Sequence, residues 1–464
     1  MQSSKLKRKM EKFLPVIGLE VHVELATKSK MFCGCPGEHF GKKPNTQTCP
    51  VCLGLPGALP VPNKKAVEWT IVLGLALGCK INSESKFDRK HYFYPDLPKG
   101  YQISQYDQPL CYNGKFEIRS TKFEIGIRRV HLEEDTGKLV HSVIGGKRVS
   151  LVDFNRSGVP LVEVVTEPDF SQVGEVMEFL RGLQHLVRWV GISEADMEKG
   201  SMRLEANVSL RRLKKQKVKS KITNQKSKPG ELPGYKVEIK NINSFRFLKA
   251  AVEYEIERQR ELLKKGERVV QETRGFDEEK GVTFPQRGKE GEADYRYFPE
   301  PDIPPMNFSD DEIEGLRQEL PELPEEVRRR FLSDYGLRGD YVEFLVHSRQ
   351  MAGYFEEAVK VGKKHGMGAE KIAGTLVNKK PDINKVLPAK LVEILRKEEE
   401  VVVLPIKELD RFVVLAIKEN LQAVTDYKKG KEGALQFLVG QVMGKAKGKA
   451  DARKIAELLK KQLK

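Results

Sequence analysis

The stretch that decides the fold of the front of this chain reads Val16-Ile17-Gly18-Leu19-Glu20-Val21-His22-Val23-Glu24-Leu25. Apolar and polar residues alternate from Leu19 onward, and successive side chains of a β-strand point to opposite faces. We therefore predict a strand that buries its apolar side chains and places Glu20, His22 and Glu24 together on the other face. That face is either solvated or holds a cation, because closely spaced acceptor groups repel one another unless a cation or proton lies among them.

Rows of the same kind occur later in the chain. In Met202–Leu210, Arg203 and Glu205 fall on one face of an alternating stretch, and Val237–Asn243 repeats the pattern with Lys240. One strand with a polar face is ordinary. Several such strands in one domain indicate a sheet whose open side is a polar cavity.

Two further stretches contribute carboxylates. Glu134 belongs to a run of three acids ahead of Gly137, which is either a solvated turn or part of a site for a divalent cation. Glu163 stands alone within the apolar run Gly158–Val165. Because a buried carboxylate without a partner is costly, we expect Glu163 to have an ion-pair partner, a metal ion or a shifted pKa.

Four cysteines follow the first strand as two close pairs, Cys33-Gly34-Cys35 and Cys49-Pro50-Val51-Cys52. Paired thiolates at this spacing are typical of a structural zinc site, in which four sulfur ligands leave no open position. Two disulfides are the alternative, although a Cys-x-Cys disulfide closes a strained ring. Six cysteines in 464 residues do not make a disulfide scaffold, so a reducing compartment is expected.

The net charge of +16 is unevenly distributed. Residues 427–464 contain eleven lysines and arginines against three acids, and residues 211–228 contain nine and no acid. Such clusters suit a nucleic-acid backbone, while a solvated helix face or loop has the same composition. Residues 88–101 interleave aromatic side chains with cations that include Lys90 and Lys99; this loop is either a stacking and phosphate-contact surface or a packed Ω-loop.

The length of the chain predicts more than one core. Prolines between residues 299 and 305 indicate a hinge, and amphipathic helical patterns follow them. No apolar run approaches the length of a membrane span. The basic segment 1–12 lacks the apolar core of a secretory signal, so we expect a cytoplasmic protein, with an organellar form left open.

Common nucleotide-binding and hydrolase motifs are absent from the sequence. There is no Gly-x-x-x-x-Gly-Lys-Ser/Thr loop, no Gly-x-Gly-x-x-Gly after a strand and no Gly-x-Ser-x-Gly elbow. If the polar sheet binds a nucleotide, we expect it to use carboxylate-bound Mg²⁺ together with lysine and arginine.

Eight stretches together resemble the B subunit of the tRNA-dependent amidotransferase, the family that converts Glu-tRNA(Gln) to Gln-tRNA(Gln) and Asp-tRNA(Asn) to Asn-tRNA(Asn). They are VIGLEVHVEL (16–25), FYPDLPKGYQISQYD (93–107), HLEEDTGK (131–138), NRSGVPLVEVVTEPD (155–169), GSMRLEANVSLR (200–211), EIKNINSFRF (238–247), DYRYFPEPD (294–302) and AVTDYKKGKEGALQFLVGQVM (423–443). They occur in order along nearly the whole chain.

The resemblance implies an α+β fold in three parts. A cradle-shaped, kinase-like mixed-sheet domain (1–299) with zinc knuckles at 33–52 would precede a helical domain (300–404) and a small helical, tRNA-binding tail (405–464). The implied activity is that of a carbon–nitrogen ligase with glutamine as amido donor. ATP phosphorylates the side-chain carboxylate of the amino acid on the tRNA, and ammonia then displaces phosphate. A partner amidase that hydrolyses glutamine would supply the ammonia through a tunnel, and a small third subunit would complete a heterotrimer.

Carried onto this sequence, the resemblance places Glu20 and His22 on the strand that binds Mg²⁺. Glu134 and Glu163 would be further Mg²⁺ carboxylates, and Lys90 and Glu205 further polar groups of the pocket. We expect the ATP contacts to come from Lys90, Lys99, Arg203 and Lys240. The four cysteines match the branch of the family that carries zinc.

Two features depart from the family pattern. The family usually has Cys-Asp where this chain has Leu204-Glu205, and the additional methylene of Glu205 changes its reach toward a metal. The segment 213–234 is longer and more basic than in the family, and its role is open. The alternative functions are a metal-dependent nuclease and a zinc-stabilised RNA-binding scaffold. For the amidotransferase, the sequence leaves open whether the substrate is Glu-tRNA(Gln), Asp-tRNA(Asn) or both.

Overall fold

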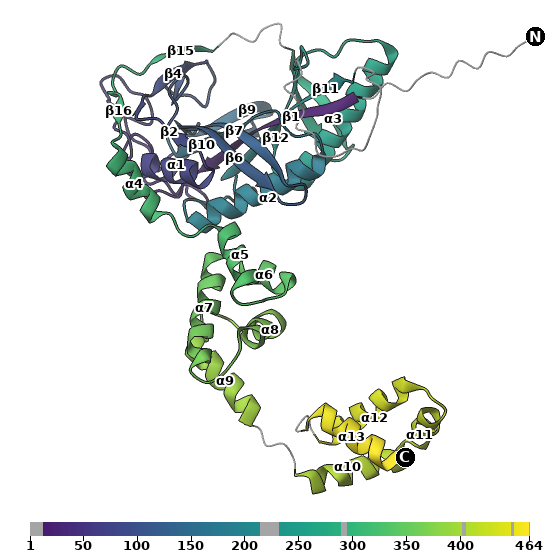
Figure 1. Cartoon of the computed structure of the whole chain (residues 1–464). Helices are drawn as coiled ribbons and strands as arrows, with labels where there is room; N and C mark the ends of the chain where they lie inside the picture. The colour runs from purple at the N-terminus through teal and green to yellow at the C-terminus, as the bar shows by residue number, and fades with distance from the viewer. Residues whose placement is uncertain (1–12, 214–231, 289–294, 401–404, 447–449, 464) are drawn as a thin grey trace, which may run out of the picture. The chain divides into compact units, whose positions relative to one another are not determined.

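The computed structural model describes residues 13–213, 232–288, 295–400, 405–446 and 450–463. They form two compact units, of which the first ends at Val327 and the second begins at Arg328. The first unit combines a large mixed sheet with helices and the second is helical (Figure 1), so the predicted α+β class is confirmed. The predicted boundaries at 299/300 and 404/405 remain predictions. Most of the basic segment 213–234 lies outside the described residues.

The first unit is built on a nine-stranded sheet in the order β14-β13-β12-β11-β1-β10-β7-β6-β2. In that order the strands are Val282–Gly288, Glu272–Asp277, Val237–Ile242, Met202–Arg212, Phe13–Glu24, Pro160–Thr166, Phe123–Glu134, Cys111–Ile118 and Lys80–Ile81. Neighbouring strands are antiparallel, except that β12 and β13 are parallel. Strand β1, predicted from its alternation, lies at the centre.

One face of this sheet forms the core. Leu19, Val21 and Val23 of β1 are buried there. They belong to one apolar cluster with side chains of α1 (Lys64–Ala76), α2 (Val173–Val190) and α3 (Phe245–Lys265). The side chain of Asn63 caps α1 by accepting hydrogen bonds from the backbone N–H groups of Lys65 and Ala66. Because these helices cover the apolar face, the row of Glu20, His22 and Glu24 belongs to the other face.

Small sheets border the large one. The aromatic and basic loop contributes β4 (Asp88–His91) and β5 (Tyr101–Ser104) to a three-stranded sheet, in which β4 lies between β5 and β15 (Arg296–Pro299). Strand β16 (Met306–Asn307) pairs with β3 (Glu84–Ser85), and β8 (Lys138–Ile144) forms a hairpin with β9 (Lys147–Asp153). The three-stranded sheet fixes the direction of Lys90, because its strand is paired on both sides.

Helices make up the described remainder of the chain. Helix α4 (Asp310–Glu319) packs Ile313 and Leu316 against the core of the first unit. The further helices are α5 (Pro324–Ser333), α6 (Gly339–Leu345), α7 (Arg349–Lys363), α8 (Ala369–Lys379), α9 (Pro388–Glu400), α10 (Ile406–Glu419), α11 (Leu421–Lys428), α12 (Glu432–Lys445) and α13 (Ala452–Leu463). Helices α10, α12 and α13 share a separate apolar core that includes Val413, Leu438 and Ile455. Among all described helices, none has both the length and the apolar character needed to cross a membrane.

Candidate functional site

The register of three neighbouring strands brings His22, Glu163 and His131 side by side on the polar face. His22 of β1 pairs with Glu163 of β10, and Glu163 pairs with His131 of β7. Glu163 Oε2 lies 3.1 Å from His131 Nε2 and 3.5 Å from His22 Nε2. Glu133 Oε1, also from β7, lies 3.6 Å from His22 Nε2. One ligand atom each from His22, Glu133 and Glu163 lies within 4.8 Å of the others, a spacing that a single cation can bridge. We call these three residues the β1 cluster.

The β1 cluster is buried and strongly charged. Glu133 and Glu163 are 2% and 7% exposed. Burial opposes the charge on Glu163, but His131 and His22 outweigh it and hold the pKa of Glu163 well below its ordinary value. Burial likewise opposes a charged His22, but Glu163 and Glu133 raise its pKa from 6.5 to about 9. When no metal ion is bound, a proton on His22 therefore supplies positive charge to the β1 cluster.

This raised pKa makes the stability of the metal-free protein depend on pH. The folded state holds the His22 proton more tightly than the unfolded state, so its contribution is complete below about pH 6.5 and is lost as the pH rises through about 9. The expected loss is about 2–3 kcal/mol in the free energy of unfolding. Unfolding of chelator-treated protein at a series of pH values measures it, and the loss should shrink in His22→Gln. Equal pH dependence in the two proteins would contradict the prediction.

A second group of carboxylates lies next to the first. Glu20, Glu205 and Glu238 also have ligand atoms within 4.8 Å of one another. The ammonium of Lys240 lies 3.3 Å from Glu205 and 3.4 Å from Glu238. The side-chain amide of Asn207 donates to Glu20 Oε1 at 2.9 Å. Burial raises the pKa of Glu205 despite the nearby Lys240. Three carboxylates share the single ammonium of Lys240 in this group.

Lys90 enters the polar face from β4. Its ammonium lies 4.8 Å from the centre of the Tyr295 ring. Burial opposes its charge, but Glu133, Glu163 and the neighbouring tyrosines together outweigh that effect and raise the pKa of Lys90. No ion pair of Lys90 with a carboxylate is formed among the described residues. Lys90 thus offers a positive charge beside the β1 cluster to an anionic ligand.

Three of the sequence-predicted site residues form ion pairs outside the two carboxylate groups. Glu134 is not part of either carboxylate group, because neighbouring residues of β7 point to opposite faces and Glu133 takes the polar one. Glu134 instead pairs with Lys99, whose ammonium lies 2.6 Å from Glu134 Oε1. Arg203 is engaged by Asp135, with Nη2 2.5 Å from Oδ2. The structure therefore brings together Glu20, His22, Lys90, Glu163, Glu205 and Lys240, and separates Glu134 and Lys99 from them. Arg203 lies opposite His22 on the same face, where Asp135 holds its guanidinium.

The sequence-based prediction missed Glu133, His131 and Glu238. The alternation rule that identified Glu20 and His22 contained the necessary signal. In β7, Leu132 is buried in the core, so His131 and Glu133 share the opposite face. In β12, Glu238 has the same parity as Lys240.

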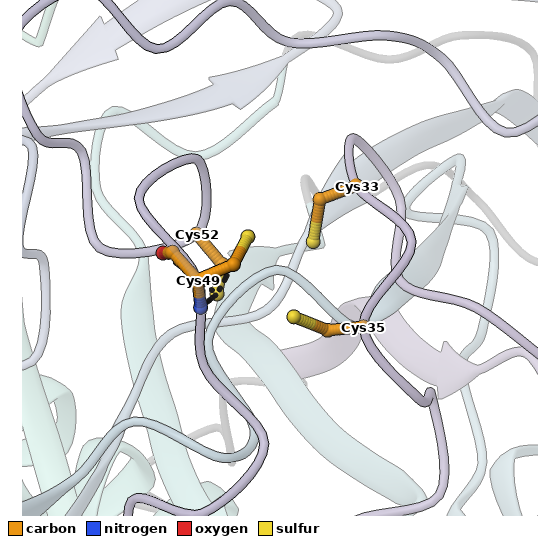
Figure 2. Close-up of side chains that lie close together, drawn as sticks. All are labelled: Cys33, Cys35, Cys49 and Cys52. Atoms are coloured by element: carbon orange, nitrogen blue, oxygen red, sulfur yellow. Dashed lines mark hydrogen bonds between the residues drawn. The ribbon is translucent and has the colours of Figure 1, made fainter.

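The four cysteines converge as predicted (Figure 2). Their sulfur atoms all lie within 4.8 Å of one another, and none forms a disulfide. The sulfurs of Cys49 and Cys52 are 3.9 Å apart, close to the ~3.8 Å expected for two thiolates bound tetrahedrally at ~2.3 Å. In Figure 2 the sulfurs of Cys33 and Cys35 point toward the other pair. Four convergent free thiols fit a zinc ion, and the disulfide alternative does not fit.

If the four cysteines hold zinc, removing it should destabilise the first unit. Because zinc binds only the folded arrangement of thiolates, a strong chelator should lower the midpoint of thermal unfolding by about 10 °C. Cys52→Ser should have a similar effect and lose bound zinc. Cys79, which lies in the core away from the other thiols, provides the control, since Cys79→Ala should keep its zinc. Identical zinc content in Cys52→Ser and the unmodified chain would refute the assignment.

Comparisons with known proteins identify the family of this chain. The family described as the GatB/GatE catalytic domain matches residues 15–314, and the family described as the GatB domain matches residues 359–463. The B subunit of the aspartyl/glutamyl-tRNA(Asn/Gln) amidotransferase of Caldicellulosiruptor saccharolyticus is 44% identical over 490 residues, covering 97% of this chain and 98% of the relative. The B subunits of Thermodesulfovibrio yellowstonii and Caldanaerobacter subterraneus are 44% and 43% identical, each covering 97% of this chain and 99% of the relative. This chain belongs to the family of aspartyl/glutamyl-tRNA(Asn/Gln) amidotransferase B subunits.

Proposed function

We propose that the chain catalyses the ATP-dependent amidation of Glu-tRNA(Gln), Asp-tRNA(Asn) or both. The γ-phosphoryl group of ATP passes to the side-chain carboxylate of the amino acid esterified to the tRNA, and ADP leaves. Ammonia then forms a bond to the acyl carbon, the bond to phosphate breaks, and inorganic phosphate leaves with the amide formed. The observation that carries this proposal is the buried β1 cluster with Lys90 beside it.

The β1 cluster fits Mg²⁺. Two carboxylates are the usual number of protein ligands for this ion, which otherwise binds water and substrate phosphate. His22, Glu133 and Glu163 would hold it, and Glu20 lies on the same face of the same strand. When bound, the ion neutralises charge on transferring phosphate oxygens. This assignment replaces Glu134 by Glu133.

The chain's own side chains supply orientation and positive charge. His131 donates toward Glu163 and fixes the direction of its carboxylate. Lys90 presents an ammonium to the anionic groups of ATP and of the amino acid. Lys240 offers a second cation, which Glu205 and Glu238 hold at 3.3 and 3.4 Å. The ion pairs of Lys99 with Glu134 and of Arg203 with Asp135 are shorter, at 2.6 and 2.5 Å. We therefore assign the phosphate contacts to Lys90 and Lys240.

A cavity of about 330 Å³ adjoins this face at Glu20. Gly18, Asn207 and Tyr235 contribute to its lining. Its size is within the range of ligand sites. A nucleotide with its base in this cavity would direct its phosphates toward the carboxylates, which supports ATP as the substrate of this face.

The remaining components of the reaction come from partners. The B subunit of an amidotransferase works with other subunits. We propose that a partner amidase supplies the ammonia and that a small third subunit joins the pair, in the cytoplasm. The +8 net charge of residues 427–464 suits the tRNA backbone. The cysteine cluster would hold a structural zinc ion.

One assay separates this function from its alternatives. The chain, co-purified with its partners, is supplied with misacylated tRNA, ATP and ammonium, and both ADP and amidated tRNA are measured. We expect both products in equal amounts, and neither when the tRNA is uncharged. A nuclease would cleave the tRNA without ATP, and an RNA-binding scaffold would consume no ATP.

A further inference from the structure

Among the described residues, Lys30 is the one lysine that the fold buries completely. It follows β1 and precedes the first cysteine pair, and its side chain is 0% exposed. A lysine ordinarily keeps its ammonium in water even when its aliphatic stem is covered. Burying the ammonium is costly unless the protein supplies both hydrogen-bond acceptors and negative charge.

The surroundings of Lys30 supply acceptors and one source of negative charge. Its ammonium donates to the carbonyl oxygens of Gln47 at 2.8 Å and Phe154 at 3.3 Å. The third partner is Cys52 Sγ at 3.6 Å. Among the described residues, Lys30 forms no ion pair with a carboxylate. The two carbonyls satisfy hydrogen bonds, but only the sulfur of Cys52 can balance the charge, and it does so as a thiolate.

A zinc ion bound by four thiolates has an excess of negative charge, the opposite of the buried Lys30 ammonium. Four negative sulfurs around a divalent ion leave a net charge of −2, which is also costly inside a protein. Lys30 and the loaded cysteine cluster therefore neutralise each other in part. The exposed lysine of the same loop, Lys42, pairs with Glu38 at 3.2 Å instead.

Lys30 also connects the cysteine cluster to the turn 154–158, which leads into β10. Phe154, whose carbonyl it binds, begins this turn. A Cβ added at Gly158 would lie 3.4 Å from the Cβ of Cys52 and 3.6 Å from the Cδ of Lys30. The backbone of Gly158 therefore packs closely against the side chains of Cys52 and Lys30. The hydroxyl of Ser157 donates to the carbonyl of Cys52 at 3.2 Å. Strand β10 starts two residues after Gly158 and carries Glu163.

We propose that Lys30 is the countercharge of the cysteine-bound zinc and ties the metal to the turn 154–158. The loaded metal site then holds the start of β10, and through it the strand that carries Glu163. This inference rests on the zinc ion of the proposed function, but not on the amidation reaction.

The test compares Lys30→Met with Lys42→Met in the full chain co-purified with its partners. Methionine keeps the length of the stem and removes the charge. We expect Lys30→Met to bind zinc about 10–100-fold more weakly in competition with a chromogenic chelator. Hydrogen exchange of residues 154–158 should become faster in its zinc-loaded form. Lys42→Met, which makes the same change of charge in the same loop, should match the unmodified chain in both measurements.

Each result decides the proposal. If Lys30→Met has the same zinc affinity and the same hydrogen exchange at 154–158 as the unmodified chain, the proposal is wrong. If Lys30→Met does not fold, Lys30→Gln, which keeps a neutral donor for the two carbonyls, should fold and still lose zinc affinity; full affinity in this variant would overturn the proposal. An unmodified chain that contains and binds no zinc would overturn the zinc assignment as well, whereas zinc retained by both variants would overturn only the role of Lys30.

Discussion

Glu163→Gln is expected to lower the rate of amide formation at saturating tRNA by at least about 100-fold, because it removes the charge that balances two histidines and holds a cation. The substitution preserves the size of the side chain, and the hydrogen bond from His131 Nε2 can persist to the amide oxygen. The affinity for tRNA should stay within about twofold, since its binding is dominated by backbone charge elsewhere. Rates of amidation and ADP release, with tRNA affinity measured separately, check this.

The matched control is Glu167→Gln. Glu167 follows β10, pairs with Arg128 at 2.7 Å and lies outside both carboxylate groups. It should keep the rate of the unmodified chain. A Glu163→Gln variant as active as this control would exclude Glu163 from the cation site.

The same assay distinguishes neighbouring acids of β7. Glu133→Gln should raise the Mg²⁺ concentration needed for half-maximal rate, because Glu133 belongs to the β1 cluster. Glu134→Gln should leave that concentration unchanged and act instead through Lys99, whose buried ammonium loses its ion pair. If instead Glu134→Gln raised the Mg²⁺ concentration and Glu133→Gln left it unchanged, Glu134 would be the Mg²⁺ ligand, as predicted from the sequence.

Deleting residues 405–464 is expected to weaken tRNA binding at least about tenfold at 50 mM salt and to flatten its salt dependence. This segment contains the basic residues 427–464. Its helices have a core of their own, so the deletion exposes no core of the first unit. Filter binding of tRNA at several salt concentrations measures both quantities. Unchanged affinity would refute the tail as a tRNA-binding domain.

A milder variant keeps the tail folded. Lys428 and Lys429 are exposed at the end of α11, and replacing both with Gln should reduce the slope of log affinity against log salt by about 2. The control replaces Lys390 and Lys397, which both pair with Glu393 on α9. An equal reduction in slope for the two pairs would contradict a specific role of the tail.

Much of the fold could be read from local patterns. The alternation in 16–25 predicted the central strand β1 and its two faces, because a period of two is a property of the extended backbone itself. The two short cysteine spacings predicted the convergent thiols, since each pair is brought together within one turn.

The sequence by itself thus determined the strand β1 with its polar row and the cysteine cluster, because each follows from residues close together in the chain, whereas the class of fold was implied by the resemblance to a known family. Only the tertiary structure decided which acids of other strands meet that row. Pairing of β1 with β10 and β11, and of β10 with β7, placed Glu163, Glu133 and Glu205 on the face of His22 and Glu20 and left Glu134 with Lys99. The physical reason is register: a shift of one residue moves a side chain to the opposite face of a sheet. Register is fixed by contacts between segments distant in the chain, such as the hydrogen bond from the Leu19 N–H to Thr166 Oγ1 across 147 positions.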